Sequence, residues 1–195
     1  MKHVPNALTI TRIVVTPLLL FLLFLDTLTG AVGALVLFIG AAISDYFDGR
    51  LARKYDVGTS FGKYLDPLAD KVLVLGTFVA LTFIRPDIVP LWAVLLIAIR
   101  DVAVTALRTW ARRRGTELTT STAAKAKTTV QLTWLISMLT FLAGTHVPGV
   151  VGKLMVDLLA TPVMQWLLVI VVAVTLLTGA AYFRAFTSAD PSTGT

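Results

Sequence analysis

Long apolar segments recur along the whole of this 195-residue chain, and they limit the fold more than any other feature. A bilayer core of about 30 Å is crossed by roughly 20 apolar residues in a helix, and a helix satisfies its own backbone hydrogen bonds in lipid. Six segments meet that requirement: 8–26, 30–53, 64–84, 88–110, 128–146 and 162–183. With 56% hydrophobic residues and a mean hydropathy of +0.84, the chain is predicted to be an all-α membrane protein, a bundle of six transmembrane helices.

The linkers between these segments are too short to hold a second domain. We therefore predict a single six-helix domain over residues 1–187 and a polar C-terminal tail, 188–195, without regular structure. The first segment is expected to be a retained helix rather than a signal peptide, because Arg12 interrupts its start and no cleavage site follows it. The absence of cysteine excludes disulfides and thiolate metal sites.

The basic residues predict how the chain lies in the membrane. A net charge of +6 on a soluble protein would suggest nucleic-acid binding, but here the cations gather at alternate ends of the apolar segments. If the N-terminus faces the cytosol, only Arg85 and Lys153 fall on the opposite side, as the positive-inside rule requires. The cations then at cytosolic ends or loops are Arg50, Arg53, Lys54, Lys63, Arg108, Arg112, Arg113, Arg114, Lys125, Lys127 and Arg184. Both termini are thus predicted to be cytosolic, and no nucleic-acid partner is expected.

A concentration of carboxylates lies between the second and third apolar segments. The stretch SDYFDGRLARKYDVGTSFGKYLDPLAD, residues 44–70, contains five aspartates: Asp45, Asp48, Asp56, Asp66 and Asp70. The first two are three residues apart and the last two are four apart, so each pair shares one helix face. The two helices are consecutive and antiparallel, so their acidic faces can meet at the cytosolic end.

Four carboxylates that converge beside a membrane predict a metal site. A charged group within the bilayer costs at least ~2.5–3.5 kcal/mol on insertion scales, and like charges at close range repel. A divalent cation removes both costs, and an all-oxygen ligand set favours Mg²⁺ or Mn²⁺. The alternative is a solvated acidic loop end; it fits Asp56 better than the others, and Asp56 is left out of the site.

Small residues beside these acids suggest a bound ligand. Gly49 and Ala52 leave room for a ligand against the second helix, and Arg53, one turn beyond Gly49, can hold a phosphate. Close helix packing explains Gly49 equally well, because small residues mark helix interfaces in membranes.

The spacing of these residues resembles the signature of the CDP-alcohol phosphotransferase family. The pattern is Asp45-x-x-Asp48-Gly49-x-x-Ala52-Arg53, eight residues, Gly62-x-x-x-Asp66-x-x-x-Asp70, with all eight signature positions present. The resemblance implies a six-helix, homodimeric membrane enzyme of phospholipid synthesis. Such an enzyme uses two divalent cations to transfer a phosphatidyl or similar group from a CDP-linked donor to an alcohol, and it releases CMP.

The resemblance also implies a role for each motif residue. The metal ligands would be Asp45, Asp48, Asp66 and Asp70. Asp70 would in addition be the general base that accepts the proton of the attacking hydroxyl. The residues that bind the CDP-linked donor would be Asp48, Gly49, Ala52, Arg53, Gly62 and Asp66.

Basic residues in three further stretches predict the acceptor alcohol. PNALTITR, near the start, and AAKAKTTVQ, at the fifth segment, resemble stretches of the phosphatidylglycerophosphate synthases, except that Ala124 replaces the usual glycine. Between them, AIRDVAVTALRTWARRRG places two arginines eight residues apart, on roughly one helix face. The predicted ligands of an acceptor phosphate are Arg12, Arg100, Arg108, Lys125 and Lys127. For the two lysines, a role in membrane topology is the alternative.

A pocket of this kind suits an acceptor that carries its own phosphate. We therefore expect transfer from CDP-diacylglycerol to glycerol 3-phosphate, with the active site facing the cytosol at a bacterial cytoplasmic (inner) membrane. Phosphatidylinositol-phosphate synthase and cardiolipin synthase are alternatives within the family. An ion-coupled transporter is an alternative from another class, but it would place its charged groups near the midplane between repeated halves, and no second copy of the acidic pattern occurs.

Overall fold

Helices account for almost all of the described chain, which comprises residues 4–55, 62–113 and 122–189 of the computed structural model. Side chains are described for residues 14–44, 71–111, 127–184 and 186. The helices are α1 (Val4–Phe24), α2 (Leu28–Tyr55), α3 (Gly62–Ile84), α4 (Leu91–Arg113), α5 (Thr122–Thr145), α6 (Val150–Ala160) and α7 (Val163–Ala189). No strand occurs in these ranges, so the prediction of an all-α protein is confirmed.

Six of the helices coincide with the six predicted segments, and the seventh, α6, lies in a stretch that was assigned to a linker. Gly149, with a φ of 87°, precedes α6 and turns the chain after α5. The 11 residues of α6 rise only about 16 Å, too little to cross a bilayer. A search for apolar segments of spanning length cannot detect a helix this short.

Many large apolar side chains are exposed on the outside of the helices among the described residues. The helix α7 is long and apolar enough to cross a membrane over Val163–Arg184, and shorter apolar stretches occur in α1, α2 and α3. Large apolar side chains point outward on four helices: Phe21 (60% exposed), Phe83 (73%), Ile99 (63%) and Leu177 (70%). A surface this rich in exposed apolar groups is typical of proteins that contact lipid, and the all-helical fold is consistent with a membrane protein.

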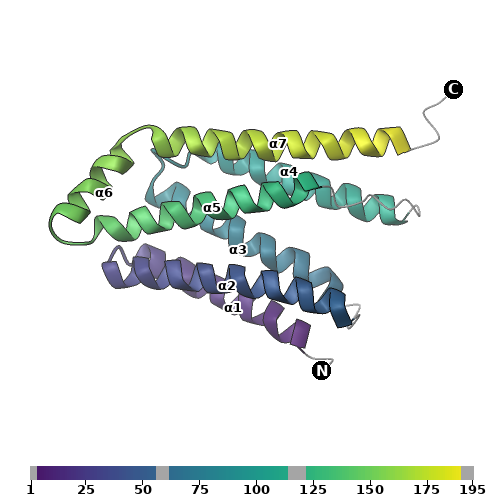
Figure 1. The fold of residues 1–195 in the computed structure, drawn as a ribbon, viewed down its shortest axis with the longest axis horizontal. Coiled ribbons are helices and arrows are strands. Elements are labelled where there is room, and N and C mark those ends of the chain that lie inside the picture. Colours follow the sequence, from purple (N-terminus) through teal and green to yellow (C-terminus); the bar gives the residue numbers. More distant parts are fainter. Residues whose placement is uncertain (1–3, 56–61, 114–121, 190–195) are drawn as a thin grey trace.

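The core lies where α5 runs between the other long helices. In Figure 1, α1 lies along α2 and α3, while α5 connects this group to α7, which in turn packs on α4. One fully buried side chain from each of five helices meets in the core: Phe38, Phe78, Ile97, Leu135 and Leu168. The ring of Phe78 stacks on Trp134 with 5.5 Å between centroids, and the indole N–H of Trp134 donates to the carbonyl oxygen of Met164.

The topology brings the predicted functional segments to one end of the bundle. Figure 1 shows that α2 and α4 end there, that α3 and α5 begin there, and that α6 lies at the opposite end. This arrangement follows from antiparallel neighbours of similar length. The acidic motif and the basic stretches of α4 and α5 therefore lie at the same end of the bundle.

At the opposite end, Arg85 is neutralised by a neighbour. Its guanidinium forms two hydrogen bonds with the Asp87 carboxylate, at 3.0 and 2.7 Å. These bonds hold the pKa of Asp87 below its ordinary value, so the pair stays ionised at neutral pH. Arg85 therefore adds no net charge to the turn between α3 and α4. It is one of the two cations, with Lys153, that the predicted topology places on the side opposite the cytosol.

A tight turn joins α1 to α2, and it yields a prediction about stability. The Thr27 hydroxyl accepts a hydrogen bond from the Gly30 N–H, at 3.1 Å, as an N-cap residue does. A Cβ atom at Gly30 would lie 2.5 Å from the carbonyl oxygen of Leu22, so the two helices would have to move apart. We expect Gly30→Ala to destabilise the protein by about 1–3 kcal/mol, the usual cost of overpacking, measured by thermal unfolding in detergent.

Gly40, also in α2, provides the matched control. A Cβ atom there meets nothing within 4 Å, so Gly40→Ala should leave stability unchanged or raise it by up to about 1 kcal/mol through helix propensity. If the two variants changed Tm equally, a clash between the new Cβ atom at Gly30 and α1 would not be the cause of the loss of stability.

Candidate active site

The acidic motif occupies two helix ends that residues 56–61 join. Asp45, Asp48 and the donor-binding positions Gly49, Ala52 and Arg53 lie in the last part of α2, and Gly62, Asp66 and Asp70 lie in the first part of α3. The helical backbone keeps the spacing of three within the first aspartate pair and four within the second, so each pair lies on one helix face. The side chains of these residues lie outside the described set, and their ligand roles stay predictions.

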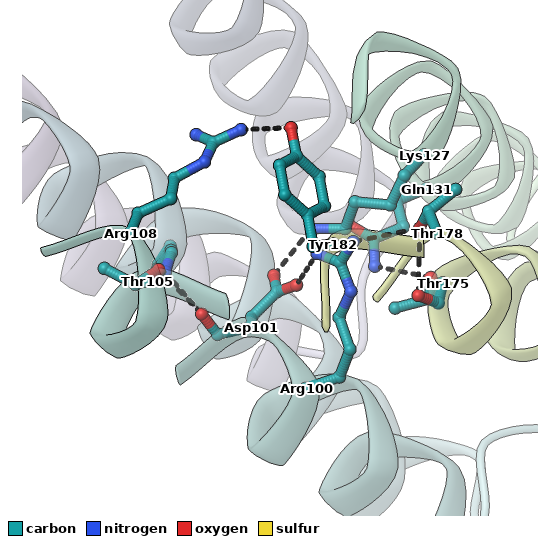
Figure 2. Close-up of polar contacts among 10 residues, drawn as sticks. Arg100, Asp101, Thr105, Arg108, Lys127, Gln131, Thr175, Thr178 and Tyr182 are labelled. Carbon is teal, nitrogen blue, oxygen red and sulfur yellow. Dashed lines mark hydrogen bonds and ion pairs between the residues drawn. The ribbon is translucent and has the colours of Figure 1, made fainter. Parts of the chain in front are cut away.

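Two of the five predicted acceptor ligands also lack described side chains. Arg12 lies within α1, and Lys125 lies in the first turn of α5. The other three, Arg100, Arg108 and Lys127, belong to a group of polar side chains between α4, α5 and α7 (Figure 2). We call this group the polar cluster; its members are Arg100, Asp101, Thr105, Arg108, Lys127, Gln131, Thr175, Thr178 and Tyr182.

Asp101 lies at the centre of the polar cluster. Its Oδ1 accepts a hydrogen bond from Nη1 of Arg100 at 3.0 Å, and its Oδ2 accepts one from Nζ of Lys127 at 2.6 Å. The Asp101 side chain is only 4% exposed, and the two cations are 9% and 12% exposed. A buried carboxylate is stable only when it is paired and hydrogen-bonded, and two cations on its two oxygens satisfy that condition. Asp101 thereby joins a helix α4 arginine to a helix α5 lysine.

Arg100 is held in place by α7 as well. Its Nη2 donates to the Thr178 hydroxyl at 2.9 Å, and this hydroxyl donates to the carbonyl oxygen of Thr175. A Cβ atom at Gly179 would lie 2.9 Å from both Cγ and Nε of Arg100, so the absence of a side chain there lets the arginine lie against α7. The buried Nε–H of Arg100 has no hydrogen-bond partner among the described residues.

Arg108 lies two turns further along α4 and also contacts α7. One guanidinium nitrogen donates to the hydroxyl of Tyr182, and the guanidinium carbon lies 4.8 Å from the centre of the Tyr182 ring. This contact combines a hydrogen bond with a cation–π interaction. The Nε–H of Arg108 is likewise buried without a partner in the described part of the chain. A buried guanidinium with unused donors suits an anionic oxygen ligand.

Lys71 links the acidic helix to the polar cluster. Its ammonium donates to the carbonyl oxygen of Asp101 at 2.8 Å and to the hydroxyl of Thr105, which itself donates to the same carbonyl at 2.7 Å. Lys71 follows Asp70 directly in α3. The backbone of the last motif aspartate is therefore held beside the helix that carries Arg100 and Arg108.

Sequence reasoning identified the cations of this cluster but not the groups that hold them. Asp101 was not among the predicted site residues, although it joins two helices. The α7 residues were missed, although their spacing carried a signal: Thr175, Thr178 and Tyr182 recur at helical intervals on one face of an otherwise apolar helix. Gln131, which the resemblance included, is buried and donates to Thr175 at 3.1 Å.

Comparison with known proteins decides the family. A sequence model described as CDP-alcohol phosphatidyltransferase matches residues 2–177. The chain belongs to this family. The chain is 37% identical over 186 residues to the CDP-diacylglycerol–glycerol-3-phosphate 3-phosphatidyltransferase of Rickettsia typhi. The aligned residues make up 95% of this chain and 97% of that relative. The protein of the same name from Escherichia coli K12 is 36% identical over 140 residues, 69% of this chain and 76% of the relative.

Membership makes the chain a transferase of phospholipid biosynthesis, as the motif predicted. The residues of the acidic motif fit a hard divalent cation, because four aspartates on two joined helix ends offer only carboxylate oxygen ligands. Among the residues that the structure describes, no other group of three or more His, Cys, Asp or Glu side chains could hold a metal ion.

Proposed function

We propose that this transferase moves the phosphatidyl group of CDP-diacylglycerol to glycerol 3-phosphate, giving phosphatidylglycerophosphate and CMP. The names of the relatives in Rickettsia typhi and Escherichia coli support this choice of substrates. The structural observation that carries the proposal is the bond from Lys71, next to Asp70, to the backbone of Asp101. It keeps the end of the acidic motif beside cations that can bind a phosphate.

The proposed reaction needs a base near the acceptor hydroxyl and cations around its phosphate. The hydroxyl oxygen of glycerol 3-phosphate forms a bond to the phosphorus that carries diacylglycerol, and the anhydride bond to CMP breaks. Asp70 accepts the hydroxyl proton. Asp45, Asp48, Asp66 and Asp70 would hold two divalent cations, Mg²⁺ or Mn²⁺, which supply charge stabilisation for the pyrophosphate and the departing CMP.

The acceptor phosphate would be bound by the cations of the polar cluster. Arg100 and Arg108 offer planar guanidinium groups with unused N–H donors, and Lys127 offers a point charge. Arg12 and Lys125 would complete the site from α1 and α5. On the donor side, Gly49, Ala52 and Arg53 of α2 and Gly62 of α3 would accept the cytidine nucleotide.

The proposed placement in the membrane follows from the helix lengths and the charges. Six helices of 21 to 28 residues would span the bilayer, while α6 would remain outside it. The end that carries the acidic motif would face the cytosol of a bacterial cytoplasmic membrane, with both termini on that side. The donor's acyl chains would stay in lipid, and the soluble acceptor would enter from the cytosol. The enzyme would act as a homodimer, as its family resemblance implies.

The choice of acceptor can be tested with the purified protein in lipid nanodiscs. Labelled CDP-diacylglycerol is supplied with glycerol 3-phosphate, inositol phosphate or phosphatidylglycerol, and CMP and lipid products are measured. We expect stoichiometric CMP and phosphatidylglycerophosphate with glycerol 3-phosphate, and rates at least about 100-fold lower with the other two, because a site built for one polar ligand rejects analogues strongly. Exclusive use of inositol phosphate or of phosphatidylglycerol would overturn the proposal. In a separate assay with sealed vesicles that contain the protein, Mg²⁺ movement without donor consumption would indicate a transporter.

A further inference from the structure

The polar cluster contains one carboxylate among its cations, and the proposed reaction gives that carboxylate no role. Asp101 is not part of the acidic motif, yet it is more deeply buried than either of its partners. Burying a carboxylate beside a site for an anionic substrate opposes binding of that substrate, because the two negative charges compete for the same cations. The position of Asp101 is explained only if the carboxylate contributes more to substrate binding than it removes by competing for the cations.

The geometry points to such a role: we propose that Asp101 is a positioning residue that orients Arg100 and Lys127 toward the phosphate of the acceptor. This inference rests on the proposed function, since it assumes that the polar cluster binds the acceptor. Each carboxylate oxygen holds one cation, at 3.0 Å and 2.6 Å, and the two cations come from different helices. Without the carboxylate, two like charges that now share one acceptor group would repel each other and separate.

The hydrogen bonds of Arg100 leave donors for a ligand. An arginine has five N–H groups in a fixed plane. Asp101 takes one from Nη1 and Thr178 takes one from Nη2, which leaves the second N–H of each of these nitrogens as the donor that can face a ligand. The buried Nε–H lies against Gly179 of α7 and is not counted among them. Two anchors on different helices therefore fix the plane of the guanidinium while part of its hydrogen-bonding capacity stays unused.

The charges of the cluster also suit a phosphate monoester. Arg100 and Lys127 pair with the carboxylate of Asp101, and Arg108 lies two turns further along α4 against Tyr182. These three cations and one carboxylate have an excess of two positive charges, and Lys71, bonded to the Asp101 carbonyl oxygen, adds a third beside them. A phosphate monoester carries about −1.5 to −2 at neutral pH. Asp101 can therefore orient its two partners without cancelling the attraction for a dianionic acceptor.

The test distinguishes three possible roles of Asp101: it positions the cations for the acceptor, it competes with the acceptor for them, or it only stabilises the fold. In nanodiscs, Asp101→Asn should raise the KM for glycerol 3-phosphate at least about tenfold and leave the KM for CDP-diacylglycerol within about twofold. Asp101→Glu keeps the charge and should recover part of that loss. A lower KM for glycerol 3-phosphate in the asparagine variant would show that Asp101 acts by competition and would overturn the inference. An equal loss toward both substrates would show a structural role only, with the same consequence.

A second variant tests the inference without removing a buried charge. Thr178→Val removes the other anchor of Arg100 and should raise the KM for glycerol 3-phosphate by on the order of tenfold, again without a matching change for the donor. Thr140→Val is the matched control, because the exposed Thr140 hydroxyl donates to the carbonyl oxygen of Ile136 in its own helix and to no other helix in the described part of the chain; it should change neither KM. Unchanged KM values in a folded Thr178→Val enzyme would overturn the inference.

The failure of this inference can be told apart from the failure of the proposed function. If the wild-type enzyme does not use glycerol 3-phosphate, the proposed function itself is wrong. If the wild-type enzyme uses it and the Asp101 and Thr178 variants keep the wild-type KM, only the role of Asp101 is wrong.

Discussion

Replacing Asp70 by asparagine is expected to lower kcat by at least about 10²- to 10⁴-fold, the range that a general base contributes. The amide cannot accept the proton of the attacking hydroxyl, and it is a weaker ligand for a divalent cation than a carboxylate. Binding of CDP-diacylglycerol should largely survive, because the other motif residues to which we assign donor binding are unchanged. Steady-state kinetics with glycerol 3-phosphate, together with donor binding by calorimetry, measure the two effects separately.

A matched control for this variant is Asp157→Asn. Asp157 is exposed on α6, at the opposite end of the bundle from the acidic motif (Figure 1). The same loss of one carboxylate there should leave kcat unchanged. If the Asp70→Asn enzyme retained a near-normal rate, another group would have to accept the proton, and the role given to Asp70 would be wrong.

Removal of divalent cations is expected to abolish CMP release completely. Without a metal ion, the pyrophosphate of the donor would approach up to four carboxylates, and repulsion between like charges would prevent productive binding. Treatment with EDTA should reduce the rate to background, and excess Mg²⁺ or Mn²⁺ should restore it. The rate of CMP release as a function of free metal concentration is the measurement.

The motif variants provide the control for chelation. Asp66→Asn should shift the metal dependence to higher concentrations, whereas Asp157→Asn should leave it unchanged. Full activity in a stringent chelator would show that the four aspartates serve another purpose.

The helices were predictable from the sequence because each long apolar segment has only one way to satisfy its backbone in lipid. The predicted segment 88–110 became Leu91–Arg113, and 64–84 became Gly62–Ile84, with boundaries that differ by a few residues. The helix α6 was not predictable by this route, because 11 residues cannot span a bilayer and their burial depends on α5 and α7.

The candidate site was predictable in its charges but not in its contacts. Arg100 was identified because it lies inside an apolar segment, where a cation needs a partner, and Lys127 because AAKAKTTVQ resembles a stretch of the phosphatidylglycerophosphate synthases. That Lys127 binds the same carboxylate as Arg100 depends on how α4 and α5 pack, and no local spacing contains that information. The contact of Lys71 with the Asp101 carbonyl is of the same kind, since it joins residues 30 positions apart.

The central claim is that aspartates from α2 and α3 together hold the catalytic cations, and locating those cations tests it most directly. Crystals of the enzyme grown with Mn²⁺ and a CDP-linked donor analogue would reveal the metal by anomalous scattering. We predict two Mn²⁺ peaks between the end of α2 and the start of α3, each within about 2.5 Å of carboxylate oxygens of Asp45, Asp48, Asp66 or Asp70. Ordered Mn²⁺ bound elsewhere, or four carboxylates that point away from one another, would contradict the claim.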